Sequence, residues 1–230
     1  MVQVNNNEKL FIRLKFRKTG NLQYISHLDL VRTMHKVIVR AALPLWYTEG
    51  FNPKPKMIFA APLSIGTESK VEFFDLRLTE RMPADEVMAR LNRNMVDDMQ
   101  IYDAYYPDTK FTDLKWLSYT ITLRLKDADA SLSEKMSEYL LCDSVEVEKK
   151  GSDELIDIRR LIKSCESSFE DGEIKLLAYL SADPSAFLNP EYIIKALRRK
   201  FDILREENLT EESYSIMREQ AYFDDMTPFR

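Results

Sequence analysis

One segment near the start of the chain constrains the fold most strongly. Within residues 10–18, apolar and basic side chains take alternate positions from Ile12 to Arg17. Successive side chains of a β-strand point to opposite faces, so this segment predicts a strand with one apolar and one basic face. A helix is expected next, from about Ser26 to Ala42, with Ser26 as its N-cap and Asp29 completing a capping-box pattern. Its apolar stripe is expected at Leu28, Val31, Met34, Ile38 and Ala42.

The elements expected after this helix follow an order that occurs twice. The first pass continues with strands at 45–47, 57–63 and 71–78, a helix opened by Pro83, and a strand at 100–106. Residues 107–114 are the best candidate boundary. The second pass has strands at 119–125, 144–148, 155–163, 174–180 and within 213–223, with helices at 131–141 and from Asn189 to about 201.

The order β-α-β-β-α-β suits a ferredoxin-like sandwich. We therefore expect an α+β protein of two tandem ferredoxin-like sandwiches. The first domain would span residues 1–110 and hold the basic motifs, and the second would span residues 111–230 and be acidic.

Charge is distributed unevenly along the 230 residues. The net charge is −5, but residues 1–60 contain ten Lys and Arg against three Asp and Glu, which gives +7. The remainder contains 23 against 35, which gives −12. The basic first quarter is therefore the region to examine for anionic partners.

Composition also excludes several classes of protein. Cys142 and Cys165 are the only cysteines, too few for a disulfide scaffold or a multi-cysteine metal site, and we expect both to be reduced thiols. Two histidines, His27 and His35, cannot form a multi-histidine metal centre. No apolar run approaches the length of a membrane span, and the first residues lack a signal-peptide pattern. We expect a cytoplasmic protein without metal, cofactor or membrane association.

Residues 44–68 are the least generic part of the sequence. Lys54 and Lys56 flank Pro55, and Tyr47 and Phe51 lie a few residues earlier. Basic groups interleaved with aromatic rings suit nucleic acid, because phosphates take the charge and bases stack on the rings. The alternative is a rigid loop that its aromatic residues fix to the core. The basic strand row has a comparable alternative, an ordinary solvated strand face.

His27 also has two interpretations. It lies in the first turn of the expected helix, where the helix dipole favours a neutral imidazole that could act as a base or donate a hydrogen bond to RNA. The alternative is a hydrogen-bonded turn histidine. His35 lies roughly 80° further around the helix, so a two-histidine acid–base site is poorly supported. The sequence has no P-loop, GxGxxG, GxSxG or HExxH motif.

Four short motifs together resemble a known family. They are KTG at 18–20, SHLDL at 26–30, EGFNPKPK at 49–56 and GTES at 66–69. In this combination the sequence resembles the radical-SAM-linked proteins, a bacterial domain of unknown function. Its members occur alone or fused to cobalamin-binding radical SAM proteins, often near ribonuclease G genes. The resemblance implies a separate radical SAM enzyme as partner and a connection with RNA. The matching residues are Lys18, Ser26, His27, Asp29, Glu49, Gly50, Phe51, Asn52, Pro53, Lys54, Pro55, Lys56, Gly66 and Glu68.

Three hypotheses follow. The leading one is a non-catalytic accessory module that presents tRNA or rRNA to a radical SAM enzyme. The second is an enzyme similar in outline to the CRISPR repeat-processing endoribonucleases, with His27 as base and Lys54 or Lys56 at the scissile phosphate; the absence of glycine from the last 50 residues counts against it. The third is a protein–protein adaptor. The candidate RNA- or partner-binding residues are Arg13, Lys15, Arg17, Lys18, His27, Tyr47, Glu49, Phe51, Asn52, Lys54, Lys56 and Glu68.

The two RNA hypotheses share one structural requirement. The basic side chains and His27 must converge on one surface, and their dispersal over the fold would contradict both hypotheses. The residues concerned are Arg13, Lys15, Arg17, Lys18, His27, Lys54 and Lys56.

Overall fold

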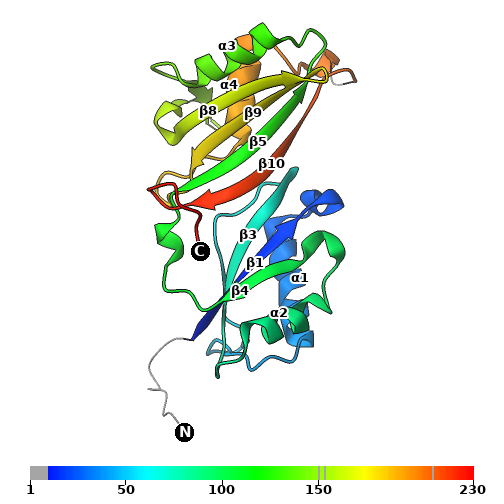
Figure 1. Cartoon of the computed structure of the whole chain (residues 1–230), viewed down its shortest axis with the longest axis vertical. Coiled ribbons are helices and arrows are strands. Elements are labelled where there is room, and N and C mark those ends of the chain that lie inside the picture. Colours follow the sequence, from blue (N-terminus) through cyan, green and yellow to red (C-terminus); the bar gives the residue numbers. More distant parts are fainter. Residues whose placement is uncertain (1–9, 150, 153, 209) are drawn as a thin grey trace. The chain divides into compact units, whose positions relative to one another are not determined.

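Helices and antiparallel strands together make this an α+β protein. The computed structural model describes residues 10–149, 151–152, 154–208 and 210–230. The chain divides into two compact units, the first made of residues 1–65, 69–110 and Arg230, the second of residues 66–68 and 111–229. Along the chain the division therefore falls chiefly between Lys110 and Phe111. Figure 1 labels the main elements.

Among the residues that the structure describes, the first unit has four strands and two α-helices. Its elements are β1 (Phe11–Lys18), α1 (His27–Arg40), β2 (Met57–Phe59), β3 (Thr67–Arg77), α2 (Ala84–Asn92) and β4 (Ile101–Tyr105). The strands run in the order β4-β1-β3-β2, and each neighbouring pair is antiparallel. Strand β1 is central, with Arg13 opposite Asp75 of β3 and Tyr105 of β4.

The alternating segment places its apolar face in the core, as expected. Ile12, Leu14 and Phe16 are fully buried and pack in one cluster with residues of both helices. Burial of these side chains is worth roughly 1.5–3 kcal/mol each, which fixes the face of β1 that meets the helices. The opposite face of the sheet carries the odd-numbered side chains of β1.

Helix α1 begins where the sequence predicts, but the residues that form its buried face differ from those expected. The Ser26 hydroxyl accepts a hydrogen bond from the Asp29 backbone N–H at 3.1 Å, which caps the helix. The buried face consists of Leu30, Met34, Val37 and Ile38, whereas Leu28, expected in the stripe, is 56% exposed. Leu28 and Leu30 are both apolar, so the pattern alone does not decide which of them faces the sheet.

The second unit has a sheet with the strand order β10-β5-β9-β8, again antiparallel throughout. A separate two-stranded sheet pairs β6 with β7. The elements are β5 (Trp116–Arg124), α3 (Ala130–Leu140), β6 (Glu146–Glu148), β7 (Leu155–Asp157), β8 (Ile162–Glu170), β9 (Glu173–Ser181), α4 (Glu191–Phe201) and β10 (Ser213–Tyr222).

Two expected strands are wrong. The strand expected at 155–163 is split between β7 and β8, because Asp157 turns the chain: its carboxylate accepts the backbone N–H groups of Val145 and Arg159, both at 2.9 Å. These bonds also lower the pKa of Asp157. Residues 45–47 form only isolated bridges, from Leu45 to Leu78 and from Tyr47 to Pro55.

Candidate functional site

The basic row of β1 lies on the face of the sheet opposite the core, but its first member does not reach solvent. Arg13 is fully buried, and its guanidinium donates two hydrogen bonds to the Asp75 carboxylate, at 2.8 and 2.9 Å. It also donates to the hydroxyl and carbonyl of Thr109, at 2.8 and 3.1 Å. Burial raises the pKa of Asp75 although Arg13 lowers it. Arg13 therefore belongs to a buried ion pair and is not available to bind phosphate.

Lys15 and Arg17 are more accessible than Arg13. Lys15 is half-buried, with its Nζ 5.5 Å from the ring centre of Phe73 and 5.6 Å from that of Tyr102. Burial lowers the pKa of Lys15, while Asp103 opposes this effect. Arg17 is exposed, and its Nε and Nη2 donate to the backbone carbonyl of Asp97 at 3.1 and 2.9 Å.

The two remaining candidates near this strand differ in exposure. Lys18 is 1% exposed and pairs with Ser69 of β3, beyond a register shift at which β3 has one residue more than β1. Lys18 is two residues after Phe16, so ordinary strand alternation places it on the same side of β1 as the buried apolar residues. Glu68 is half-buried, in the short segment that groups with the second unit.

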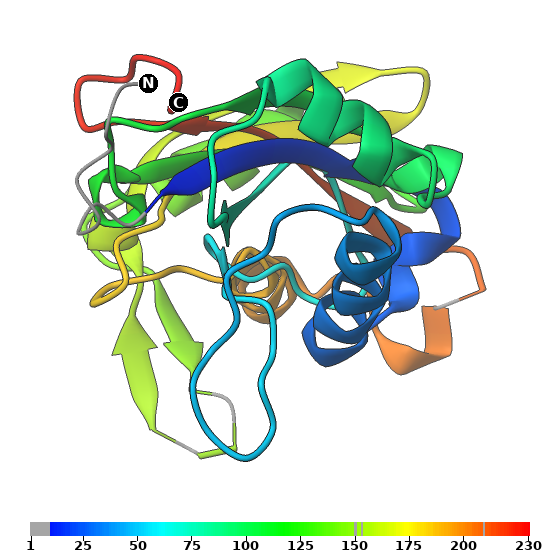
Figure 2. The same cartoon turned by 90° about the horizontal axis from the view of Figure 1, so that it is seen from below.

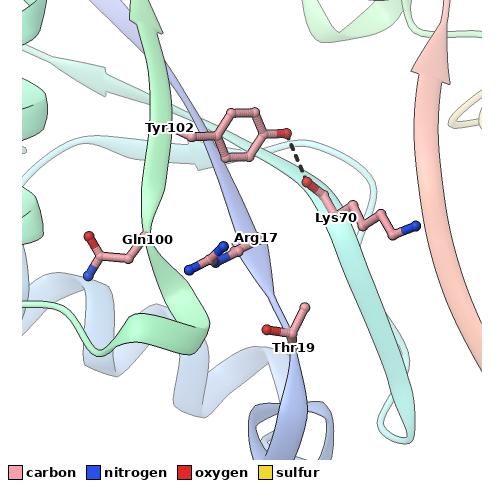
Figure 3. Close-up of a pocket in the computed structure, with 5 residues that line it drawn as sticks. All are labelled: Arg17, Thr19, Lys70, Gln100 and Tyr102. Atoms are coloured by element: carbon pink, nitrogen blue, oxygen red, sulfur yellow. Dashed lines mark hydrogen bonds between the residues drawn. The ribbon is translucent and has the colours of Figure 1, made fainter.

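An open depression of about 450 Å³ lies beside Arg17 on this part of the sheet. Figure 3 shows its lining side chains, which come from the ends of three strands. They are Arg17, Thr19, Lys70, Gln100 and Tyr102. Of these five residues, only Arg17 is among the binding residues that the sequence predicts. The other four are far apart in sequence and form no motif, so only the strand order brings them together.

His27 lies on the helix side of the sheet. Its ring meets that of Phe59 edge to face, with 5.4 Å between ring centres. Phe59 in turn contacts the buried rings of Phe16 and Phe74. His35 follows the buried Met34 in α1. Partial burial and the nearby positive charge of Lys54 lower the pKa of His35. Lys54 is thus close to His35, whereas His27 packs against Phe59 and not against a loop lysine.

The loop from Leu45 to Lys56 has its own hydrogen-bond framework. Thr48 N–H donates to the Lys54 carbonyl at 2.9 Å, and Lys54 N–H donates to the Thr48 hydroxyl at 3.1 Å. Lys56 N–H donates to the Trp46 carbonyl at 3.0 Å, and the Trp46 ring packs 4.0 Å from the Arg77 guanidinium. Figure 2 shows the loop extending away from β1 on the side of α1.

The tip of this loop is exposed. Phe51 is fully accessible, with a relative exposure of 113%, and Tyr47 is 44% exposed. Glu49, Asn52 and Lys54 are exposed as well, and Lys56 is half-buried. The alternative in which aromatic residues fix this loop to the core does not apply to Phe51, and Trp46 packs on the Arg77 side chain of β3.

The seven residues required by both RNA hypotheses therefore do not converge. Arg13 and Lys18 are buried, Lys15 and Arg17 lie on the sheet face opposite the helices, and Lys54 and His27 lie beside or in α1. This dispersal contradicts both hypotheses in the form that uses all seven. Two smaller surfaces remain as candidate binding sites: the loop tip and the depression beside Arg17.

Metal clusters and membrane-spanning helices are both absent from the part of the chain that the structure describes. Within the described residues, no group of three or more His, Cys, Asp or Glu side chains is placed to hold a metal ion. The same residues include no helix that is long and apolar enough to cross a bilayer. Both surfaces instead combine cations with aromatic rings, a chemistry that binds anions and planar groups.

Comparisons with known proteins add a family but no activity. No curated protein matches the chain. A crystal structure of an unknown protein from Galdieria sulphuraria aligns over 92% of this chain and 99% of its own, at 8% identity and a TM-score of 0.28, which is too low to carry an argument. A family model described as an uncharacterised protein conserved in bacteria (DUF2344) matches residues 12–190 of the 230. The chain therefore belongs to this uncharacterised bacterial family.

Proposed function

We propose that this protein is a non-catalytic accessory module that binds single-stranded RNA through the loop of residues 46–56. The observation that carries the proposal is the position of Phe51, fully exposed at the tip of a hydrogen-bonded loop. A phenylalanine ring that is fully exposed at the tip of a restrained loop has its face accessible to a planar group of a partner. Bases stack on such rings with little regard to sequence.

The surroundings of Phe51 favour RNA over an apolar partner. Tyr47 supplies a second exposed ring, and Lys54 and Lys56 supply positive charge on the same loop. Two prolines and the bonds between Thr48 and Lys54 restrain the backbone, which lowers the entropy lost on binding. The RNA hypothesis is thus kept in a narrower form than the sequence predicted, with four residues on one loop.

The fold is compatible with such a role. We infer that both units are variants of the ferredoxin-like sandwich, since each has the strand order 4-1-3-2 with antiparallel neighbours. The second unit would then carry the β6–β7 hairpin as an insertion between its first helix and second strand. The same fold class hosts many RNA-binding domains, so the fold is compatible with the proposed role, whereas the proposal itself rests on the loop residues.

The partner follows only from the sequence resemblance. We propose that the module presents tRNA or rRNA to a separate radical SAM enzyme in the cytoplasm, and that it needs no cofactor of its own. Co-purification of the two proteins, with and without nuclease, tests this part. A complex that requires intact RNA supports presentation of RNA, whereas a complex indifferent to nuclease supports the adaptor hypothesis instead.

Binding is tested by fluorescence anisotropy with a labelled single-stranded RNA of twelve nucleotides. Because stacking on an aromatic side chain is worth about 1–3 kcal/mol per base, Phe51→Ala should weaken binding by about 5- to 150-fold. Tyr24→Ala is the matched control, since Tyr24 is also exposed, at 65%, but lies outside the loop. Equal losses in the two variants, or no binding by the wild-type protein, would exclude the proposal.

Salt dependence provides a second measurement. Each phosphate contact to a single strand contributes about −0.7 to the slope of log K against log salt. The double variant Lys54→Gln/Lys56→Gln should therefore reduce the steepness of this slope by up to about 1.4. An unchanged slope would mean that the two lysines do not contact phosphate.

The endoribonuclease hypothesis has a direct test. Labelled RNA is incubated with the wild-type protein and with His27→Ala. Because the His27 ring packs against Phe59, we expect no cleavage that depends on it. Cleavage by the wild type that His27→Ala abolishes would replace the binding proposal by the enzymatic one.

A further inference from the structure

We propose that the depression beside Arg17 binds the phosphate monoester of a nucleotide and packs the base against Tyr102. The depression is formed by Arg17, Thr19, Lys70, Gln100 and Tyr102 on the sheet face opposite the helices (Figure 3). It is distinct from the loop of residues 46–56, so this inference goes beyond the proposed RNA contact and does not depend on it.

Arg17 supplies the positive charge that would bind the phosphate. Its guanidinium is held by a neutral acceptor, the Asp97 carbonyl, through Nε and Nη2. In the part of the chain that the structure describes, Arg17 forms no ion pair with a carboxylate, and its Nη1 has no hydrogen-bond acceptor. The carbonyl fixes the orientation of the side chain without neutralising it. A pre-oriented guanidinium with unused donors suits phosphate, which accepts charge-assisted hydrogen bonds.

Apart from Arg17, the residues that line the depression are mostly polar and uncharged. Lys70 of β3 also lines the depression, with its carbonyl toward Tyr102 and its ammonium group directed away from Arg17 (Figure 3), and Thr19 lines it next to β1. No carboxylate is among the lining side chains. The carboxylates of Asp103 and Glu72 lie close enough to Tyr102 to raise its pKa, although neither of them lines the depression. The volume of about 450 Å³ lies within the range of sites for small ligands.

Tyr102 supplies an aromatic ring on which a planar base could pack. Its hydroxyl donates to the Lys70 carbonyl at 2.8 Å, which holds the ring across the strands, while the side chain stays 47% exposed. Burial and the neighbouring Asp103 raise the pKa of Tyr102, so the ring is neutral at pH 7. The Lys15 Nζ lies 5.6 Å from its ring centre. A fixed, partly exposed aromatic ring that shares its depression with the Arg17 guanidinium matches a planar base attached to a phosphate.

The test uses amide chemical shifts of the full-length protein during titration with AMP, adenosine and inorganic phosphate. We expect AMP to shift the amides of Thr19, Lys70 and Gln100 and to bind about tenfold more tightly than adenosine. Titration with a trinucleotide, with and without a 5′-phosphate, distinguishes a free nucleotide from the 5′ end of RNA as the source of this chemistry.

Variants decide whether the named residues are responsible. Arg17→Gln should weaken AMP binding about tenfold, whereas Lys135→Gln, which removes an exposed charge on α3, should leave it unchanged. Phe51→Ala should not alter the AMP titration, so failure of the loop proposal and failure of this one give different results. Equal affinity for AMP and adenosine, shifts confined to other residues, or an unaffected Arg17→Gln variant would each overturn the inference.

Discussion

The buried ion pair between Arg13 and Asp75 provides the most specific prediction about stability. Arg13→Met removes the guanidinium but keeps a long apolar side chain, and it leaves the Asp75 carboxylate buried without its two charge-assisted bonds. The two side chains are 1% and 12% exposed, so solvent does little to replace the lost partner. Removing one member of a buried pair costs about 3–5 kcal/mol, and we expect a loss in the free energy of unfolding of that size.

The double variant Arg13→Met/Asp75→Asn separates the ion pair from simple packing. If the uncompensated charge of Asp75 causes the loss, neutralising it should restore about 2 kcal/mol. Unfolding in urea can be followed by fluorescence in a Trp116→Phe background, where Trp46 reports on the first unit alone. A cost below about 1 kcal/mol for Arg13→Met, or no recovery in the double variant, would refute the reasoning.

The same pair predicts a dependence on pH. Burial raises the pKa of Asp75 above its ordinary value, whereas the hydrogen bonds and the positive charge of Arg13 lower it. In Arg13→Met this pKa should therefore rise further. Between the ordinary pKa and the raised one, the folded state binds more protons than the unfolded state, so stability increases as the pH falls. The deficit of Arg13→Met should thus be largest near pH 7 and shrink toward pH 5, and Asp75→Asn should abolish this trend.

Three further predictions concern single residues. Ser26→Ala removes the cap of α1 and should cost about 1 kcal/mol by urea unfolding, with a cost near zero arguing that the bond to the Asp29 backbone is not formed in solution. Phe51→Ala should change stability by less than about 0.5 kcal/mol, because the side chain is fully exposed; a larger loss would show that Phe51 packs in the fold. Of the thiols, exposed Cys142 should react with a disulfide reagent in the native protein, whereas burial raises the pKa of Cys165 to about 12 and should delay its reaction until unfolding. Two fast thiols would contradict this assignment.

Local patterns predicted most elements of the fold. The strict alternation from Ile12 to Arg17 identified β1 and its buried face, because the two-residue period of a strand is visible in any single stretch of sequence. The capping residue Ser26 located the start of α1. Errors arose where a side chain distant along the chain decides the backbone path, as at Asp157, whose bond to Val145 splits the strand expected there.

The candidate site was predicted less well, for a physical reason. The sequence reveals that Arg13, Lys15 and Arg17 share a strand face, but their exposure depends on what the neighbouring strands place beside them. Asp75 of β3 withdraws Arg13 into the protein, whereas the carbonyl of Asp97 leaves Arg17 at the surface.

The sequence by itself therefore determined most of the elements, the charge asymmetry and the unusual loop of residues 46–56, because these depend on neighbours in the chain; the exposure of Phe51 came only from the structure. Only the tertiary structure decided that the basic residues divide between two faces and the interior, and that Lys70, Gln100 and Tyr102 join Arg17 around one depression. Strand order brings together residues more than 80 positions apart, and a sequence read segment by segment contains no signal for that pairing.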